Sequence, residues 1–134
     1  MSNARAGIEN TLYRYAWAYD MDLLDELDEV FTQDAECEYM DVGLKSGHRE
    51  VVAEQKARHG KYADGTIPWH VISNIYITDE TDTTATVRSW WTFFVQAADG
   101  SQRFAGAGWY DDRFKLEDGV WRIWKRRILK PNER

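Results

Sequence analysis

Cysteine and proline are both scarce in this sequence, and each scarcity excludes a class of protein. The one cysteine, Cys37, can form no disulfide within the chain and cannot by itself build a cysteine-based zinc site. We therefore expect a reducing, cytoplasmic setting. With two prolines, 43% hydrophobic and 14% aromatic residues, the composition differs from that of disordered chains, which are poor in apolar side chains. The length suits one folded domain, which we place at residues 1–134.

Long hydrophobic runs and an excess of positive charge are also missing. No segment approaches the roughly 20 apolar residues that a membrane-spanning helix needs, and the first ten residues, MSNARAGIEN, lack the hydrophobic core of a signal peptide. Acidic residues outnumber basic ones by 23 to 17, and the net charge of −6 argues against a phosphate-binding surface. We expect neither a membrane nor a nucleic acid as a partner.

Sequence signatures of bound cofactors are absent as well. The chain has no phosphate-binding glycine loop, no GxSxG or HExxH motif and no dinucleotide-binding fingerprint. The run Gly106-Ala107-Gly108 lies inside a strand-like segment, where it predicts a β-bulge or a tight bend. We therefore expect no metal and no cofactor.

Helical periodicity occupies the first part of the chain. Apolar residues recur with helical spacing over residues 6–20, and a second, acidic helix is predicted over residues 21–31. A brief strand is a candidate at residues 35–40. Ser46 resembles the N-cap of a third helix, which ends at Gly60.

The remainder has the composition of β-strands. Four segments rich in β-branched and aromatic residues are separated by Asp- and Gly-containing turns, and they cover roughly residues 69–78, 84–96, 103–116 and 120–129. Because the connections are short, these strands should be antiparallel neighbours, and the fold class is α+β with the sheet wrapped around the helices. Aromatic residues on both faces of the segment 88–94 favour a homodimer or higher homo-oligomer through the sheet.

Histidine is the side chain best suited to proton transfer near neutral pH, because imidazole ordinarily has a pKa of about 6.5. His48 and His59 lie at predicted helix ends, as structural or solvated residues. His70 instead begins a long apolar strand, where a bare imidazole needs a hydrogen-bond partner. Asp20 ends the first helix, and a partly buried carboxylate there should pair with a donor such as His70 or Arg126. A satisfied core histidine and a helix-capping aspartate remain the alternatives.

The last predicted strand carries two consecutive arginines, Arg126 and Arg127, which a regular pleat points to opposite faces. One of them must therefore point inward, where it could anchor a carboxylate or a substrate oxygen. An arginine on a sheet face shared between subunits is the competing explanation.

Five short segments occur in a recognisable order along residues 8–128: YRYAWAYD (13–20), VFTQDA (30–35), HVISN (70–74), GWYDD (108–112) and DGVWRI (118–123). None is diagnostic alone, but together they resemble the SnoaL-like branch of the nuclear-transport-factor-2-like superfamily. The resemblance implies a cone-shaped half-barrel, in which a strongly curved antiparallel sheet is closed by N-terminal helices around a deep pocket.

The resemblance extends to the dehydrochlorinase, bile-acid dehydratase and scytalone dehydratase enzymes of that superfamily, and it implies a working Asp–His pair at Asp20 and His70. It also implies Arg126 as the pocket arginine, with Arg127 as the alternative, and Tyr15 as a pocket residue. Such enzymes carry out cofactor-independent dehydratase, lyase or isomerase chemistry. The histidine would act as base, Tyr15 would donate to an oxygen, and Arg126 would stabilise negative charge.

Aromatic side chains suit a small, hydrophobic, cyclic substrate, and the candidate substrate-binding residues are Phe31, Trp91, Phe93, Phe104 and Tyr110. Two other functions stay open. One is a polyketide-cyclase-type aldol catalyst in which Asp20 is the base. The other is a non-catalytic small-molecule-binding or assembly subunit, like the small subunits of aromatic-ring dioxygenases.

Overall fold

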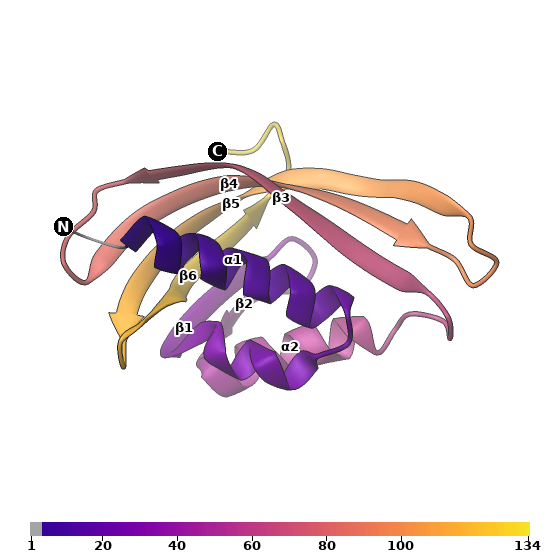
Figure 1. Ribbon diagram of the computed structural model, residues 1–134, viewed down its shortest axis with the longest axis horizontal. Helices are drawn as coiled ribbons and strands as arrows, with labels where there is room; N and C mark the ends of the chain where they lie inside the picture. Colours follow the sequence, from indigo (N-terminus) through magenta and orange to yellow (C-terminus); the bar gives the residue numbers. More distant parts are fainter. Residues whose placement is uncertain (1–3) are drawn as a thin grey trace.

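The computed structural model describes residues 4–134, which form a curved six-stranded sheet with helices on one side (Figure 1). The elements in chain order are α1 (Ala4–Asp20), the 3-10 helix η1 (Leu24–Glu29), β1 (Phe31–Tyr39), β2 (Gly43–Ser46), α2 (His48–His59), β3 (Ile67–Thr78), β4 (Thr84–Gln96), β5 (Gln102–Glu117) and β6 (Val120–Leu129). In space the strands follow the order β2-β1-β6-β5-β4-β3. The predicted α+β class and the curved sheet are confirmed.

The four long strands β3 to β6 pair antiparallel with their neighbours in sequence, which confirms that prediction. The sheet is not antiparallel throughout, however, because β1 pairs parallel with β6 and places Cys37 opposite Arg126. Strand β6 takes its direction from the hairpin with β5, and β1 runs the same way beside it. The half-barrel is therefore a mixed sheet that stays open, with β2 and β3 at its edges.

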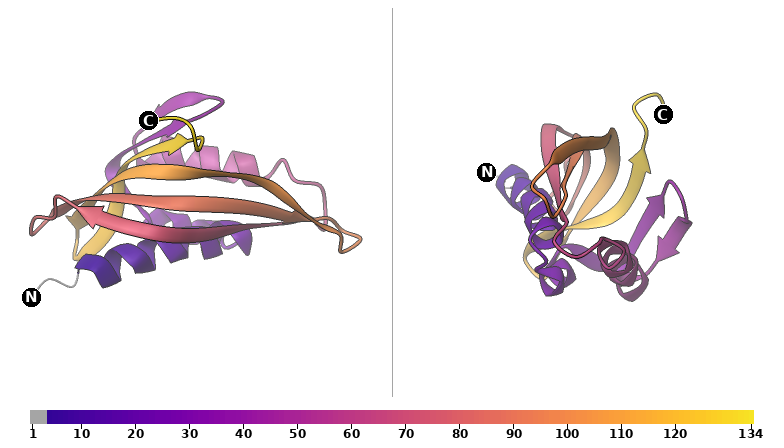
Figure 2. Two further views of the ribbon diagram at one scale, coloured as in Figure 1. Left: turned by 90° about the horizontal axis from the view of Figure 1, so that it is seen from above. Right: turned by 90° about the vertical axis from the view of Figure 1, so that its right-hand side faces the viewer.

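Both α-helices lie on the concave side of the sheet (Figures 1 and 2). Helix α1 buries one face, including Ile8, Leu12 and Tyr15. Gly7 allows a close approach to β6, because a Cβ at that position would lie 2.8 Å from the Trp121 ring. Within residues 4–134, no helix combines the length and the apolar character needed to cross a membrane.

The segments before the long strands differ from the sequence prediction. The predicted second helix is only a short 3-10 helix, and Phe31, expected at its end, begins β1 and pairs with Ile123. The prediction of Ser46 as an N-cap is wrong, because this residue ends β2, and Gly47 precedes α2 without a side-chain cap. Strand β2 was missed because it is a four-residue edge strand with no alternation of buried and exposed residues.

The two glycines of β5 have separate structural roles. At Gly106 the φ angle is 149°, and the register between β4 and β5 shifts after Phe93, which confirms the predicted bulge. Gly108 is needed for space, because a Cβ there would lie 2.1 Å from the Leu129 carbonyl oxygen and 2.5 Å from the Trp91 indole. Trp91 therefore packs directly on the backbone of β5.

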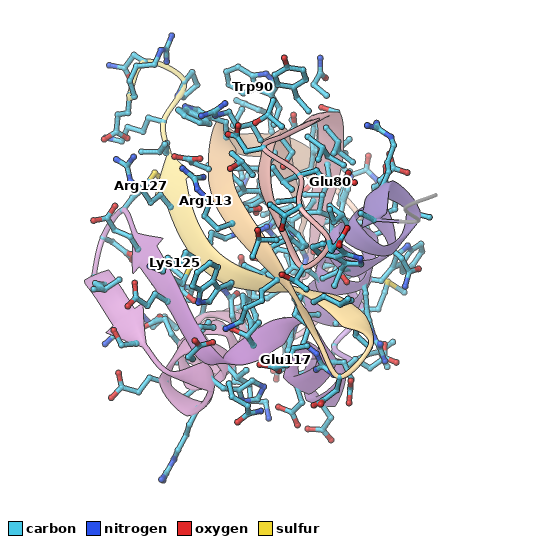
Figure 3. The ribbon with its side chains drawn as sticks, turned by 90° about the vertical axis from the view of Figure 1, so that its left-hand side faces the viewer. Glu80, Trp90, Arg113, Glu117, Lys125 and Arg127 are labelled. Atoms are coloured by element: carbon cyan, nitrogen blue, oxygen red, sulfur yellow. The ribbon has the colours of Figure 1, made fainter. Side chains whose placement is uncertain are left out.

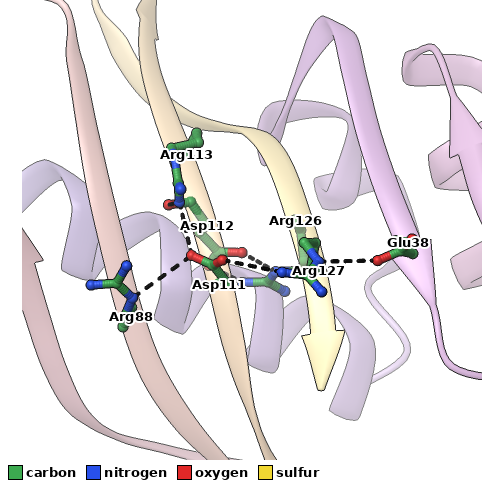
Figure 4. Close-up of polar contacts among 7 residues, drawn as sticks. All are labelled: Glu38, Arg88, Asp111, Asp112, Arg113, Arg126 and Arg127. Carbon is green, nitrogen blue, oxygen red and sulfur yellow. Dashed lines mark hydrogen bonds and ion pairs between the residues drawn. The ribbon is translucent and has the colours of Figure 1, made fainter. Parts of the chain in front are cut away.

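The two consecutive arginines of β6 lie on opposite faces of the sheet, one buried and one exposed, and Figure 4 shows their polar contacts. Arg126 is the inward one, and its fully buried guanidinium donates two hydrogen bonds to Asp112, of 2.8 and 2.9 Å. Burial opposes its charge, but the attraction of Asp112 outweighs this and raises the pKa of Arg126. Arg127 is 46% exposed and donates to Glu38 on the outer face.

Loss of the buried cation should be costly. In Arg126→Met, the Asp112 carboxylate is left buried without its partner, and the free energy of unfolding should fall by roughly 3–5 kcal/mol. The matched variant Arg127→Met removes an exposed ion pair and should cost less than about 1 kcal/mol. Urea denaturation followed by circular dichroism measures both values, and equal losses would contradict this account of the pair.

Candidate active site

A cavity of about 360 Å³ lies between the concave face of the sheet and the two α-helices. Aromatic rings and one imidazole form much of its wall, from Tyr15 and Tyr19 of α1, His70 of β3, Phe93 of β4 and Tyr110 of β5. Because these side chains come from opposite sides of the core, the packing of α1 against the sheet shapes the cavity. Such a wall suits a small apolar ligand.

At the edge of this cavity, Asp20 holds His70 by two hydrogen bonds. The His70 ring Nδ1 lies 2.7 Å from Oδ1 of Asp20, and the His70 backbone N–H donates to Oδ2 at 2.7 Å. Both side chains are about nine-tenths buried, with relative exposures of 10% and 9%. The end of α1 is thereby attached to β3. Asp20 does not line the cavity itself, so it acts on His70 from behind.

The imidazole is also fixed by its ring contacts. It stacks on Phe93 with ring centroids 4.7 Å apart and an interplanar angle of 13°. The rings of Tyr15 and Tyr19 meet it edge-on at 5.7 and 5.3 Å. Since Nδ1 is bonded to Asp20, Nε2 is the ring nitrogen left for a ligand.

Buried hydroxyl groups form a second polar cluster. The Tyr15 hydroxyl donates to Oε1 of Gln55 at 3.5 Å, and Nε2 of Gln55 donates to the Tyr39 hydroxyl at 2.8 Å. Burial raises the pKa of Tyr15 above its ordinary value, although the nearby charge of Arg126 works in the opposite direction. Tyr15 is therefore protonated at neutral pH and can donate a hydrogen bond. Burial also raises the pKa of Tyr110 above its ordinary value.

Arg126 lies behind these tyrosines and not on the cavity wall. Its guanidinium carbon is 3.6 Å from the centroid of the Tyr110 ring and 4.8 Å from that of Tyr15. Two of its nitrogens are bonded to Asp112. The sequence analysis gave an inward arginine two possible partners, a carboxylate or a substrate oxygen, and in the structure Arg126 binds the Asp112 carboxylate. The rings of Tyr15 and Tyr110 lie against its guanidinium.

Three of the five predicted substrate-binding aromatics, Trp91, Phe93 and Tyr110, line the cavity. The other two do not. Phe31 is fully buried in the core, with its ring 6.3 Å from that of Tyr15, and Phe104 is 61% exposed. The alternation of side chains along a strand could not distinguish these two residues from those that line the cavity. Phe31 was assigned to a helix, and the bulge near Phe104 changes which side chains of β5 point to each face of the sheet.

A polar part of the cavity wall was missed by the sequence analysis. It contains Arg58 and Lys61, which lie in and just after α2, and Asp41 of the β1–β2 turn. Arg58 donates to Asp41, lies 3.0 Å from Glu54, and sits 4.4 Å above the ring of Tyr39. Its hydrogen bond lowers the pKa of the Asp41 carboxyl. These residues lie in a turn and at the end of a helix. The sequence has no regular hydrophobic pattern there from which a cavity wall could be predicted.

The sequence analysis also missed Gln55, although the position of this residue in the sequence indicates that it is buried. It lies four residues after Val51 on the buried side of α2, and it is only 2% exposed. A glutamine on the apolar stripe of a helix must find hydrogen-bond partners inside the protein, so its position indicates a buried polar network.

Comparisons with known proteins agree with this architecture. The SnoaL-like domain family matches residues 1–127 of the chain. A Mycobacterium tuberculosis (strain ATCC 25618 / H37Rv) protein, named Uncharacterized protein Rv2910c, is 29% identical over 126 residues, which cover 91% of this chain and 82% of that protein.

Several solved structures share the fold. The protein Aln2 from a Streptomyces species has a TM-score of 0.84 at 20% identity and covers 97% of this chain and 92% of its own. A Novosphingobium aromaticivorans protein named as a scytalone dehydratase has a TM-score of 0.77 at 23% identity, with 97% and 93% covered. A second protein from that organism, named as the beta subunit of an aromatic-ring-hydroxylating dioxygenase, has a TM-score of 0.76 at 20% identity, with 98% and 91% covered. At these identities the likeness shows the fold alone.

The hydrogen bond from Asp20 should determine the tautomer of His70. We expect the neutral ring to carry its proton on Nδ1, because the carboxylate accepts it, and Nε2 to be unprotonated. Long-range ¹H–¹⁵N correlation spectra in alkaline solution distinguish the two tautomers. Asp20→Ala should shift the ring toward a mixture of tautomers, whereas Asp34→Ala, at an exposed aspartate of β1, should not. A wild-type ring protonated on Nε2 would contradict the assignment.

Proposed function

This chain belongs to the SnoaL-like domain family, and on that premise we propose that it is a cofactor-independent acid–base enzyme acting on a small, apolar, cyclic compound. The reaction would be an elimination, such as a dehydration, or an isomerisation. His70 would be the base, Asp20 the residue that orients it, and Tyr15 a hydrogen-bond donor whose hydroxyl would turn from Gln55 to a substrate oxygen.

The observation that carries this proposal is the pair of 2.7 Å hydrogen bonds between Asp20 and His70 at the wall of an aromatic cavity. A carboxylate bonded to Nδ1 selects one tautomer and stabilises the imidazolium that forms when Nε2 takes a proton. The stacked Phe93 ring prevents the imidazole from turning away. A base is effective when it is held in this way within reach of a bound substrate.

The proton transfer follows from this geometry. His70 would remove a proton from a carbon next to an electron-withdrawing or leaving group. In an elimination the C–H electron pair becomes the new double bond, and the leaving group departs with its bonding pair. In an isomerisation His70 returns the proton to a different carbon. Negative charge on a substrate oxygen would be stabilised by a hydrogen bond from the hydroxyl of Tyr15 or Tyr110. The rings of both tyrosines lie beside the Arg126 cation.

The alternative aldol mechanism would use Asp20 as the base. Both oxygens of Asp20 accept hydrogen bonds from His70, and Asp20 is not among the residues that line the cavity. These facts favour His70 as the group that meets substrate. The dehydratase named among the structural neighbours supports the enzymatic proposal, and the dioxygenase beta subunit represents its rival, an assembly role.

Deuterium exchange tests the proposed base without knowledge of the natural substrate. The cyclic ketone 2-tetralone, a small carbon acid, should lose its α-protons to D₂O faster with the protein present, as followed by ¹H NMR. His70→Ala and Asp20→Ala should each slow the catalysed exchange by roughly 10²- to 10⁴-fold, because a positioned base contributes about that much.

The control is His48→Ala, which removes an imidazole that contacts the Asp28 carbonyl outside the cavity and should leave exchange unchanged. Circular dichroism establishes that every variant is folded. Exchange that persists at the wild-type rate in His70→Ala would disprove the proposed base. A large loss in Asp20→Ala with a small loss in His70→Ala would support the aldol mechanism instead.

We further propose that the chain forms a homodimer through the outer face of the sheet. Tyr76 and Trp90 are 63% and 40% exposed there, and in Figure 3 Trp90 projects from the top of the sheet, away from the helices. The neighbouring charges are paired within the chain, as in Arg113 with Asp111 at 2.8 Å. This leaves the aromatic patch as the surface that gains most from burial.

Analytical ultracentrifugation at micromolar concentration should therefore give a mass near twice the 15.7 kDa of the chain. Trp90→Lys should shift the protein toward the monomer, because it puts a charge in the proposed interface. Trp17→Lys, at a 62% exposed tryptophan of α1, is the matched control and should stay dimeric. A monomeric wild-type protein would rule out the dimer.

A further inference from the structure

A chain of hydrogen bonds at the cavity wall joins two tyrosines through the side-chain amide of Gln55. Nε2 of Gln55 donates to the Tyr39 hydroxyl at 2.8 Å, and the Tyr15 hydroxyl donates to Oε1 of Gln55 at 3.5 Å. All three residues line the cavity, and their relative exposures are only 2% to 3%. Because so little of their surface is exposed, the partners of these donors and acceptors must come from the protein or from a ligand.

The direction of these hydrogen bonds is set at the far end of the chain. The Tyr39 hydroxyl donates to the backbone carbonyl of Val51 at 3.5 Å, and a carbonyl oxygen can only accept. The Tyr39 oxygen is left to accept from Nε2 of Gln55, so Oε1 of the amide faces Tyr15. Tyr15 has one hydroxyl proton, and in this arrangement the proton is bonded to Gln55. Tyr15 can therefore donate to a substrate only after that bond is released.

Two movements could free the Tyr15 proton for a substrate oxygen, and they differ in cost. If only the Tyr15 hydroxyl turned away, Oε1 of Gln55 would be left buried without a donor, which is unfavourable. If the Gln55 amide also rotated by half a turn, Nε2 would donate to Tyr15 and Oε1 would accept from Tyr39 at the short end of the chain. The bond given up would be the long one from Tyr39 to Val51, whose carbonyl in α2 also accepts the helical hydrogen bond. The rotation thus replaces one long bond within the protein by one bond to the ligand.

We propose that Gln55 is a positioning residue whose amide rotates when a substrate oxygen enters the cavity, and that this rotation makes the Tyr15 hydroxyl available as a donor. The inference rests on the proposed function of Tyr15. In the rotated state Tyr15 accepts from Nε2 of Gln55 while it donates to the substrate, and a hydroxyl that accepts one hydrogen bond becomes a stronger donor of another. A ligand without oxygen leaves the Tyr15 proton bonded to Gln55. The site thereby offers its donor only to a ligand that can accept from it.

NMR spectra of the Gln55 side-chain amide test the rotation directly. The ligand 2-naphthol supplies an oxygen, and naphthalene has the same rings without it. Gln55→Met identifies the amide signals by their disappearance, and Tyr15→Phe and Tyr39→Phe identify the two tyrosine rings. In the free protein and with naphthalene, the amide protons should show their stronger nuclear Overhauser effects to the Tyr39 ring. With 2-naphthol, the stronger effects should be to the Tyr15 ring.

Binding affinities provide a second readout, through a variant in which a carboxylate replaces the amide. The carboxylate of Gln55→Glu can only accept, so it retains the Tyr15 proton, and 2-naphthol should bind roughly tenfold more weakly, the usual effect of one lost hydrogen bond. Naphthalene binding should change by less than about twofold. Lowering the pH should restore the 2-naphthol affinity relative to that of the wild-type protein, because a protonated carboxyl has a donor and an acceptor, like the amide. Gln102→Glu, at an exposed glutamine of β5, is the matched control and should change neither affinity.

Three results would each overturn the inference: 2-naphthol that does not bind, amide protons that do not change partner in its complex, or a 2-naphthol affinity of Gln55→Glu that equals the wild-type value at every pH. These measurements require no turnover, so their outcome is separable from that of the exchange experiment. Rotation of the amide without catalysed exchange would refute His70 as base and leave the role of Gln55 standing. Catalysed exchange without rotation would refute the role of Gln55 and leave the proposed base standing.

Discussion

A single carboxylate at the end of α1 fixes both the backbone and the ring of His70, and the arrangement of the cavity depends on it. The two 2.7 Å contacts of Asp20 require the last turn of α1 to lie against β3. That position is possible because the helix approaches the sheet closely, with Gly7 beside Trp121 at its other end. The tyrosines of α1 are then brought over the imidazole, and the cavity between helix and sheet acquires its aromatic wall.

Charge in this protein is divided between the two faces of the sheet. The ion pair of Arg126 with Asp112 is fully buried on the inner face, and the rings of Tyr15 and Tyr110 lie against its guanidinium. The outer face carries exposed pairs such as Arg127 with Glu38 (Figure 4). A buried cation next to phenol rings favours negative charge near their hydroxyl groups, and it needs no direct contact with a ligand to do so.

The features that the sequence predicted are those with a regular period or a short separation along the chain. The helix ending at Asp20, the four long antiparallel strands and one inward arginine on the last strand follow from helical spacing, short turns and strand parity. The choice of Arg126 over Arg127 came from the family resemblance. What remained hidden depends on contacts between distant segments. The parallel β1–β6 pairing is one case, and the partnership of Arg126 with Asp112 is another.

Prediction of the cavity wall from the sequence was limited in the same way, because contacts between distant segments decide it. The aromatic content of the sequence indicated Phe93 and Trp91 as pocket residues, but it could not reveal that Gly108 leaves space for the Trp91 indole or that Gln55 joins two tyrosines. The glycine was interpreted only as a source of backbone freedom, whereas its role is to leave space. Such roles depend on which side chain lies across the sheet, and that is decided by register and not by local pattern.

The central claim is that Nε2 of His70 faces bound substrate while Asp20 holds the opposite nitrogen. A crystal structure of the protein with 2-naphthol, a planar analogue of a cyclic enol, tests it most directly. The account predicts the naphthol in the cavity with an atom within about 3.5 Å of Nε2 and the Asp20 bond to Nδ1 intact. A ligand bound elsewhere, or an Nε2 covered by protein atoms, would contradict it.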